Sequence, residues 1–279
     1  MLNLKIILMK FGVMLVVNKH QEYIKSIKRN KTIVLLSQIF LIIFILSLWD
    51  LLSKFNVIDS FIFSSPSSIF KLMIEYLKSN ELIHHAFVSS YEVILGLIIG
   101  SLLGIIIAIV LYEIPILAKI LDPFLIVLNA LPKTALAPIL IIWVGTSIKG
   151  IVFVSISISL VITIISAYNA FSSVSSEKIR LLQSFKASRV QILKYLIIPS
   201  NIDNLISIIK VNIGMSWIGV IVGEFIVSKS GLGYLITYGT QVFRLDLVMM
   251  GIMTLAIVTV IMYGILNFSV KIYKKYRGW

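Results

Sequence analysis

The segment LLQSFKASRVQILKYLIIPS, Leu181–Ser200, is polar and basic, yet it lies between two long apolar runs. It belongs to a stretch over 172–204 whose pattern predicts two short amphipathic helices joined by a turn. Ser188, with Gln191 three residues later, matches a capping box, in which each side chain bonds a free backbone amide at a helix start. Pro199 is predicted to end the second helix, because proline disfavours helical geometry in the preceding residue. The segment is therefore predicted to be a helix–turn–helix on a membrane surface.

Each predicted helix of this stretch carries apolar residues on one face. The faces are Leu181, Leu182 and Phe185 in the first helix, and Ile192, Leu193, Leu196 and Ile197 in the second. Ser200 with Asp203 is expected to cap the apolar helix that follows. A solvated linker is the alternative, and the agreement of two caps, a proline and the apolar pattern favours the helices.

The composition of the chain is that of an integral membrane protein. Of its 279 residues, 59% are hydrophobic and 13% charged, whereas a soluble domain is about a quarter charged. The net charge of +13 raises the possibility of nucleic-acid binding, but the basic residues flank apolar segments, as the positive-inside rule expects. The chain has no cysteine, which excludes disulfides and thiolate metal sites.

Six stretches are apolar enough, over about 20 residues, to predict membrane spans. They are Ile33–Leu52, Tyr91–Tyr112, Pro123–Val144, Lys149–Phe171, Leu205–Val227 and Leu247–Phe268. The fold class is therefore all-α, a polytopic membrane helical bundle with six transmembrane helices. The third span contains Pro132, Lys133 and Pro138, which predict a kinked or broken helix. Two tolerated kinks and a break that lines the solute pathway are both open, because a broken helix needs protein or a water-filled cavity around it.

Lysine and arginine residues predict the orientation of the chain. They are concentrated before the first span, in the C-terminal tail and in the 172–204 loop, so both termini and this loop are expected to be cytoplasmic. The predicted divisions are a basic N-terminal segment, 1–32, a first transmembrane helix with an external amphipathic segment, 33–90, a core with the loop, 91–270, and a basic tail, 271–279.

Two spans carry glycines at a spacing of four residues. They are Gly96, Gly100 and Gly104 in the second span, and Gly219 and Gly223 in the fifth. This spacing places the glycines on one helix face and lets another backbone approach closely. It predicts tight helix packing, either within the protomer or with a second protomer.

A few ionisable residues within the spans are functional candidates. Lys133 is expected either to attract an anionic solute or to pair with a carboxylate or backbone carbonyls. Glu224, near the outer end of the fifth span, is a pathway candidate whose expected role is a structural hydrogen bond. Lys210 is expected to extend to the membrane interface. His84 and His85 have no carboxylate or cysteine at ligand spacing, so no metal site is predicted.

The chain contains no signature of an ATPase or of a catalytic nucleophile with its base. Gly145 and Gly150 have the spacing of a phosphate-binding loop, but Ile151 stands where lysine is required. Energy for any work that the protein performs must therefore come from a partner or an ion gradient.

Several separated motifs resemble binding-protein-dependent ABC importer permeases of the nitrate, sulfonate, taurine and bicarbonate branch. The spacing from Lys186 to Pro199 is similar to the family's "EAA" loop. LDPFLIVLNALPKTALAPILIIWVG over 121–145 resembles the third span of that branch, and GMSWIGVIVGEF over 214–225 with SGLGYLI over 230–236 resembles the fifth span and its outer loop. The resemblance covers roughly Ser65 to the C-terminus.

The resemblance implies a MetI-like bundle in a bacterial plasma membrane, working as a permease homodimer. It implies a cytoplasmic ATPase partner that binds ATP and magnesium, an external solute-binding protein, and a small anionic or polar organic solute. The chain itself is then neither an enzyme nor a cofactor-binding protein. The residues that would couple to the ATPase are Arg180, Leu181, Leu182, Lys186, Ala187, Ser188, Arg189, Leu196, Ile198 and Pro199.

The match departs from the family's pattern inside the loop. The Glu-Ala-Ala of the family falls on Arg180, Leu181 and Leu182, and its glycine falls on Lys186. That glycine takes a left-handed conformation that costs a lysine on the order of 1 kcal/mol. Either the turn differs here, or the ATPase partner has changed with it.

Two further functions stay open at this point. The first is a secondary transporter driven by an ion gradient. It would need a relay of intramembrane acids, for which the spans offer only Asp50, Glu92 and Glu224 near their ends. The second is a relative of the permeases that has lost transport and acts as a scaffold.

Overall fold

The computed structural model describes residues 29–30 and 32–277, and every regular element within these ranges is a helix. The predicted N-terminal segment therefore lies almost entirely outside the described residues. The described residues form two compact units, which divide after Ser68. Helical structure throughout is what a membrane-spanning chain requires, because a helix satisfies its own backbone hydrogen bonds.

The first unit contains one long apolar helix, Thr32–Lys54, with the mean hydropathy and the length of a membrane span. Its last turn is tied to the start of α3, Pro66–Lys78. Asp50 pairs with Lys54 at 2.7 Å and accepts a hydrogen bond from the backbone N–H of Ser67 at 3.2 Å. The short helix α2, Ser60–Phe63, lies between them.

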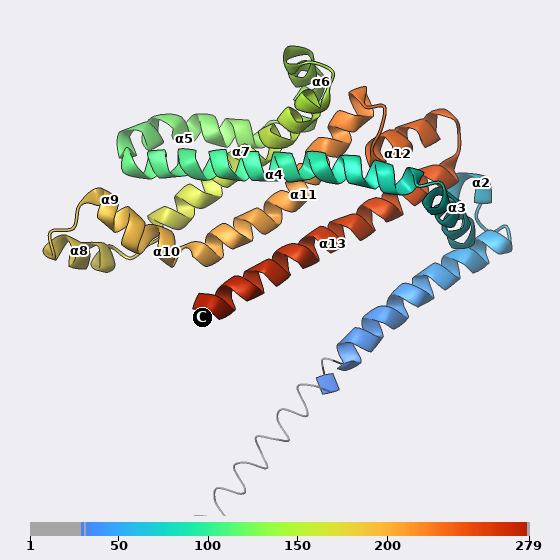
Figure 1. The fold of residues 1–279 in the computed structure, drawn as a ribbon, viewed down its shortest axis with the longest axis horizontal. Coiled ribbons are helices and arrows are strands. Elements are labelled where there is room, and N and C mark those ends of the chain that lie inside the picture. The colour runs from blue at the N-terminus through green and yellow to red at the C-terminus, as the bar shows by residue number, and fades with distance from the viewer. Residues whose placement is uncertain (1–28, 31, 278–279) are drawn as a thin grey trace, which may run out of the picture. The chain divides into compact units, whose positions relative to one another are not determined.

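The second unit begins within α3 and contains the remaining helices. These are α4 Glu81–Glu113, α5 Pro115–Ala130, α6 Lys133–Val144, α7 Ile148–Ser172, α8 Ser176–Ser184, α9 Arg189–Ile192, the π-helix η1 Leu193–Ile197, α10 Ile198–Ser200, α11 Ile202–Val227, α12 Leu232–Gln241 and α13 Leu245–Arg277 (Figure 1). Among the described residues five helices can span a membrane, and α5 with α6 adds a sixth if the bent pair counts as one span.

The bent pair confirms the break predicted in the third span, but the predicted bounds of that span are wrong. The helices α5 and α6 meet at 100° instead of forming one helix over 123–144. Leu131, which precedes Pro132, takes an extended conformation with φ −65° and ψ 134°. A proline favours this geometry in the residue before it. Pro123 and Pro138 lie within helices and cause no break.

The helix α7 is the centre of the second unit, and its small residues face glycines of α4. Gly96, Gly100 and Gly104 lie directly over the side chains of α7. A Cβ added to Gly100 would lie 2.3 Å from the Oγ of Ser159, which occupies the space above the glycine. The glycines of the second span therefore pack within the protomer.

The glycines of α11 also pack against α7, and Gly219 of α11 and Gly96 of α4 both lie against Ser155. A Cβ on Gly219 would lie 2.4 Å from the Cα of Ser155, and one on Gly223 would lie 3.0 Å from a side-chain carbon of Ile151. Helices packed at this distance gain van der Waals contact and interhelical hydrogen bonds, which drive association in a membrane.

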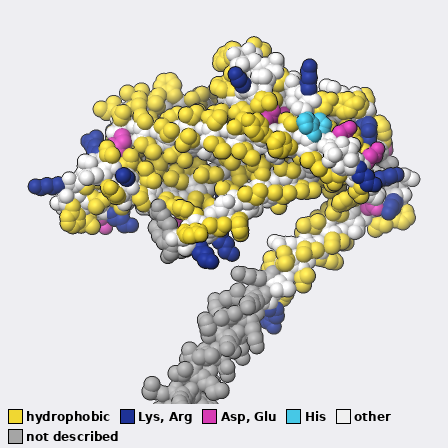
Figure 2. Space-filling model, viewed as in Figure 1, with side chains coloured by type: hydrophobic (Ala, Val, Ile, Leu, Met, Phe, Trp, Pro, Cys, Tyr) yellow, Lys and Arg dark blue, Asp and Glu magenta, His cyan; other side chains and the backbone are white. Residues whose placement is uncertain are grey.

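A buried hydrogen-bond network fastens the same three helices. The side-chain amide of Asn212 on α11 donates to Ser101 on α4 at 2.8 Å and to Thr163 on α7 at 2.7 Å. Such bonds satisfy polar atoms that would be costly in an apolar interior. In the space-filling view, apolar side chains cover the flank of this unit, and lysine and arginine gather towards its ends (Figure 2).

Candidate functional site

The 172–204 segment forms the helix–turn–helix predicted from the sequence. After α7 ends at Ser172, the chain forms α8, turns, and continues through α9, η1 and α10 into α11. This group of short helices lies at one end of the second unit (Figure 1). It is referred to below as the coupling segment.

The turn between α8 and α9 is a Schellman motif built on a lysine. Lys186 has a left-handed φ of 58°. Its N–H donates to the carbonyl of Gln183 at 2.8 Å, and the N–H of Ala187 donates to the carbonyl of Leu182 at 3.1 Å. These two bonds define the Schellman ending of a helix, which usually places glycine at the left-handed position. The turn keeps the left-handed geometry expected for glycine. A change in turn geometry therefore does not explain why lysine stands at position 186, where the family has glycine.

The start of α9 confirms the predicted capping box. The N–H of Gln191 donates to the Oγ of Ser188 at 3.3 Å, and the N–H of Ser188 donates to the Oε1 of Gln191 at 2.7 Å. A cap of this kind stabilises a helix by about 1 kcal/mol, which matters for a helix of only four residues.

The prediction that Pro199 ends the second helix is wrong. Ile198 before it stays helical, with φ −62° and ψ −50°, and the helix continues to Ser200. In an α-helix the proline ring would clash with the carbonyl of Tyr195, four residues earlier. Tyr195 lies in the π-helix Leu193–Ile197, whose wider turn changes the position of that carbonyl. The π-helix is therefore the local adjustment that accommodates the proline.

The predicted cap of α11 by Ser200 and Asp203 is also wrong. The cap position is Asn201, which makes no side-chain capping bond. Ser200 donates instead to the carbonyl of Ile197 at 3.1 Å, and Asp203 pairs with Lys274 of α13 at 2.6 Å. Both side chains thus bind other partners, which the spacing alone did not indicate.

The inner face of the coupling segment is anchored on the ends of three long helices. Ile192 and Ile197 are buried in a cluster with Ala108 of α4, Phe171 of α7 and Ile208 of α11. The predicted apolar face of the second helix is therefore confirmed. This packing fixes the position of the short helices relative to the bundle, because a close-packed apolar cluster resists deformation.

The outer face of the segment exposes large apolar side chains. Leu181 is 58% exposed and Phe185 is 74% exposed, and Val190 and Tyr195 are each 67% exposed. The predicted apolar face of α8 is thus wrong for Leu181 and Phe185, since Leu182 alone of the three predicted residues packs inward. Leu181, Leu182 and Phe185 cannot all reach the apolar cluster from so short a helix. Exposed apolar side chains amid polar ones often mark a protein–protein contact.

The ten residues assigned to ATPase coupling divide equally between the two faces. Arg180, Leu181, Lys186, Ser188 and Arg189 are exposed, whereas Leu182, Ala187, Leu196, Ile198 and Pro199 are half-buried. The first group is available to a partner, and the second holds the segment on the bundle. A cavity of about 220 Å³ lies beneath the exposed Arg189, between the α4–α5 junction and the segment.

The residues predicted for the solute pathway occupy two separate environments. Pro132 and Lys133 are at the α5–α6 break, where the Nζ of Lys133 donates to the carbonyl of Asn129 at 3.4 Å. Pro138 lies inside α6. The backbone pairing expected as one alternative for Lys133 is therefore present. Glu224 belongs to a buried cluster on other helices.

Glu224 accepts hydrogen bonds that fasten the turn between α11 and α12. The Oγ of Ser89 on α4 and the N–H of Gly233 each donate to its carboxyl group at 2.5 Å. The N–H of Leu232 donates to Ser89 at 2.7 Å, and the N–H of Gly231 donates to the Nδ1 of His85 at 2.9 Å. His85 thus binds the backbone, and no cluster of three possible metal ligands occurs in the described part of the chain.

Glu92 is the member of this cluster that the sequence analysis left without a partner. Its carboxyl group is in hydrogen-bonding contact with that of Glu224. An ionisable residue in a predicted span was the available signal, but sequence spacing gave no way to pair a residue of α4 with one of α11.

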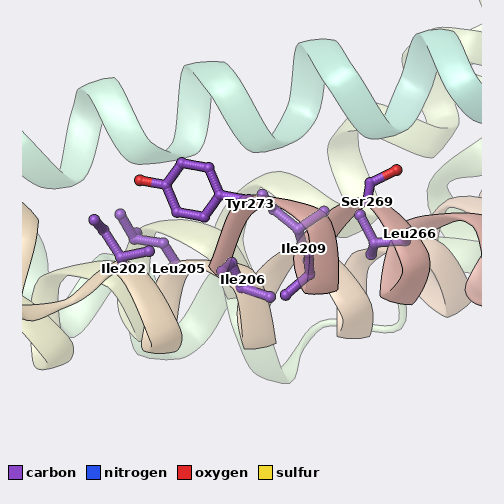
Figure 3. Close-up of a pocket in the computed structure, with 8 residues that line it drawn as sticks. Ile202, Leu205, Ile206, Ile209, Leu266, Ser269 and Tyr273 are labelled. Atoms are coloured by element: carbon purple, nitrogen blue, oxygen red, sulfur yellow. The ribbon is translucent and has the colours of Figure 1, made fainter. Parts of the chain in front are cut away.

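A second cavity is too apolar to hold a polar solute. It has a volume of about 330 Å³ and lies between α11 and α13, with Ile206, Ile209 and Leu266 among its lining residues (Figure 3). Solute sites combine apolar walls with a few polar groups that orient the ligand. The ring of Tyr273 and Ser269 lie along its edge (Figure 3), and the Asp203–Lys274 ion pair joins the same two helices.

Comparison with known proteins identifies relatives over most of the chain. Residues 100–276 match the family described as "Binding-protein-dependent transport system inner membrane component". A protein of Haemophilus influenzae described as a probable ABC transporter permease is 25% identical over 229 residues, which covers 82% of this chain and 93% of that protein.

Two further relatives have names that state what they transport. A permease of Bacillus subtilis named for aliphatic sulfonates is 26% identical over 77% of this chain and 78% of its own length. The taurine transport system permease of Escherichia coli is 24% identical over 77% of this chain and 80% of its own length.

Proposed function

Since this chain belongs to the family of binding-protein-dependent transport system inner membrane components and is a permease subunit of an ABC importer, we propose that a cytoplasmic ATPase subunit docks on its coupling segment. The observation that carries this proposal is the division of the segment into an anchored face and an exposed apolar face. The membership of the family also removes the reason to retain an ion-gradient transporter. ATP and magnesium then bind to the partner subunit.

The exposed apolar residues supply the contact that such docking needs. Leu181 projects from α8 and Phe185 from the cap residue after it, and Val190 and Tyr195 project from the helices that follow. Aromatic residues are enriched where one protein binds another, and a few of them carry most of the affinity. The exposed basic residues Arg180 and Arg189 lie among them and add charge complementarity to an acidic partner surface.

The anchored face explains how docking would move the bundle. Ile192 and Ile197 pack against side chains of α4, α7 and α11, so a displacement of the segment displaces the ends of all three helices. Transitions between two states are transmitted by packed rigid elements. The segment therefore fits a role in linking ATP hydrolysis to inward-facing and outward-facing states.

The test is co-purification of the ATPase subunit with the permease. Deletion of residues 186–194 is expected to abolish the complex while the permease still inserts into the membrane. Phe185→Ser is expected to weaken the complex without the loss of structure that a deletion can cause, and Lys178→Gln on the exposed side of α8 is the control. An unchanged complex in the deletion variant would disprove docking on this segment.

We also propose that a second copy of the chain covers the α5–α6 break. Leu131 and Pro132 are exposed within the protomer, although the helix is interrupted there. Interrupted backbone within a membrane is tolerated where it is covered by protein or lines a water-filled path. A homodimer whose pathway runs along this break meets both conditions, and Lys133 then offers a cation to an anionic solute.

The absence of cysteine from the sequence makes this dimer easy to test. Leu131→Cys is expected to form a cross-linked dimer in oxidised membranes, and Ile98→Cys, exposed on α4, is the control. Equal cross-linking of the two variants would count against the break as the dimer contact.

The orientation and the solute complete the proposal. The excess of lysine and arginine supports a cytoplasmic location for both termini and the coupling segment, in a bacterial plasma membrane. An external binding protein would deliver the solute, and the names of the relatives make a sulfonate-like anion the first to test. Thermal-shift screening of the cognate binding protein against taurine, alkanesulfonates and nitrate would identify it.

A further inference from the structure

Two carboxyl groups meet in the interior where α4 and α11 lie beside the start of α12. Glu92 and Glu224 are each only 1% exposed, and their carboxyl groups are in hydrogen-bonding contact. None of the three salt bridges in the described part of the chain involves either residue. No lysine or arginine among the described residues therefore forms an ion pair with either acid.

Two ionised carboxylates cannot share such a site. Like charges in contact repel strongly in a low dielectric, and burying an unpaired charge costs several kcal/mol. A single proton removes the repulsion and supplies the donor for the hydrogen bond between the two groups. A pair of acids that holds one proton is the standard solution to this geometry.

The surroundings of the two groups decide which one carries the proton. Both oxygens of Glu224 accept hydrogen bonds, from the hydroxyl of Ser89 and from the N–H of Gly233. The Oε2 of Glu92 is buried and has no hydrogen-bond partner. Donors favour the ionised form of a carboxyl group, and a site without donors favours the neutral acid.

We propose that Glu92 and Glu224 form a proton-binding site, in which Glu92 is the neutral acid that donates to the Glu224 carboxylate and thereby holds the α11–α12 turn against α4. This proposal goes beyond the transport function above and does not depend on the solute. The bound ligand is a single proton, held between Glu92 of α4 and Glu224 of α11.

The carboxylate of Glu224 acts as the anion at the start of α12. Gly231 is the cap residue of that helix, and the N–H of Gly233 in its first turn donates to Glu224. An anion is stabilised at this end of a helix by the free N–H groups and the helix dipole. A Cβ on Gly231, which has a φ of +112°, would lie 2.4 Å from the carboxyl carbon of Glu224, so the turn closes directly over the carboxylate.

Loss of the proton should release this turn. Without the proton, the two negative charges repel and the hydrogen bond between α4 and α11 is lost.

The other titratable side chains at the cluster are His85, which accepts from Gly231, and its ring neighbours His84 and Tyr234. From α7, the side chains that touch the nearby glycines of α11 are Ile151 and Ser155, neither of which titrates. The native state holds a proton that an unfolded glutamate releases below neutral pH, so stability should fall as the pH rises.

The first test replaces each of the two glutamates in turn by glutamine and follows the thermal unfolding of the purified protein. Glu92→Gln keeps a neutral donor towards Glu224, so it is expected to retain the unfolding temperature and to lose the fall in stability that the natural protein shows as the pH rises. In Glu224→Gln, the hydroxyl of Ser89 and the N–H of Gly233 both need an acceptor, but the glutamine amide has only one acceptor oxygen. This substitution is expected to lower the unfolding temperature. Equal damage from the two substitutions would overturn the assignment.

A second readout follows the turn itself and works even if a variant is unstable. Ser230→Cys introduces the only thiol of the chain, next to the turn. Its labelling rate by a polar thiol reagent is expected to rise with pH, and the pH dependence should disappear in the Glu92→Gln background. Glu224→Gln should accelerate labelling about tenfold, because one of the two buried donors loses its acceptor. A pH dependence that survives in Glu92→Gln after correction for thiol ionisation would refute the proton site.

Discussion

Replacing Lys186 by glycine should stabilise the turn at the centre of the coupling segment. Lys186 has a φ of 58° and donates one of the two Schellman bonds. A left-handed conformation costs a residue with a Cβ about 1–2 kcal/mol. Glycine removes this strain but loses about 0.5–1 kcal/mol more conformational entropy on folding. The net gain for Lys186→Gly is therefore about 0.5–1 kcal/mol.

Hydrogen exchange at the two bonded amides measures this gain where it arises. A gain of about 0.5–1 kcal/mol slows exchange through local opening by about two- to fivefold. The amides to follow are those of position 186 and Ala187, in the permease without its ATPase partner. Lys186→Ala is the matched control, since alanine loses the same charge and keeps the strain. If Lys186→Ala slows exchange as much as Lys186→Gly, the lysine charge and not the backbone strain limits the turn.

Three further predictions concern packing, capping and transport. Gly104→Ala would place a Cβ 2.5 Å from a carbon of α7 and should destabilise the protein by about 1–3 kcal/mol, whereas Gly214→Ala, with open space around it, should leave the unfolding temperature unchanged or higher. Equal shifts would argue against close α4–α7 packing. Ser188→Ala should cost α9 about 1 kcal/mol, read as faster amide exchange in α9 alone; exchange that rises across the whole segment would contradict a local cap. Lys133→Ala should lower solute uptake more than Lys210→Ala, and equal, mild effects would remove Lys133 from the pathway.

Features that depend on near neighbours in the sequence were predicted well. The capping box at Ser188, the break before Pro132 and the inward face of the second short helix each follow from residues within one or two helical turns. The error at Pro199 arose inside the same range. A proline restricts its neighbour on average, but the widened turn of η1 gives the chain another way to place it. Local sequence rules therefore identify a proline as a conflict with helical geometry, but they do not determine how the chain relieves that conflict.

Features that depend on helix register were not predictable from one sequence. Ser89 and Glu224 are 135 positions apart yet hydrogen-bonded, and the contact requires α4 and α11 to slide and rotate into one particular alignment. The glycine spacing identified which faces pack closely, but not that the glycines of both helices pack against α7. The exposure of Leu181 and Phe185 likewise depends on how α8 is set against the bundle, which its own nine residues do not determine.

The helices α4 and α11 reach both the coupling segment and the acid pair. Ala108 and Ile208 pack against the coupling segment, and Glu92 and Glu224 lie towards the other ends of the same two helices. Between these points both helices pack on α7 through glycines, which bring the backbones close together. Packing of this kind favours movement of the three helices as one body over bending within them. A push on the coupling segment should therefore reach the Glu92–Glu224 contact with little loss, and a change of protonation there should alter the work required of the ATPase.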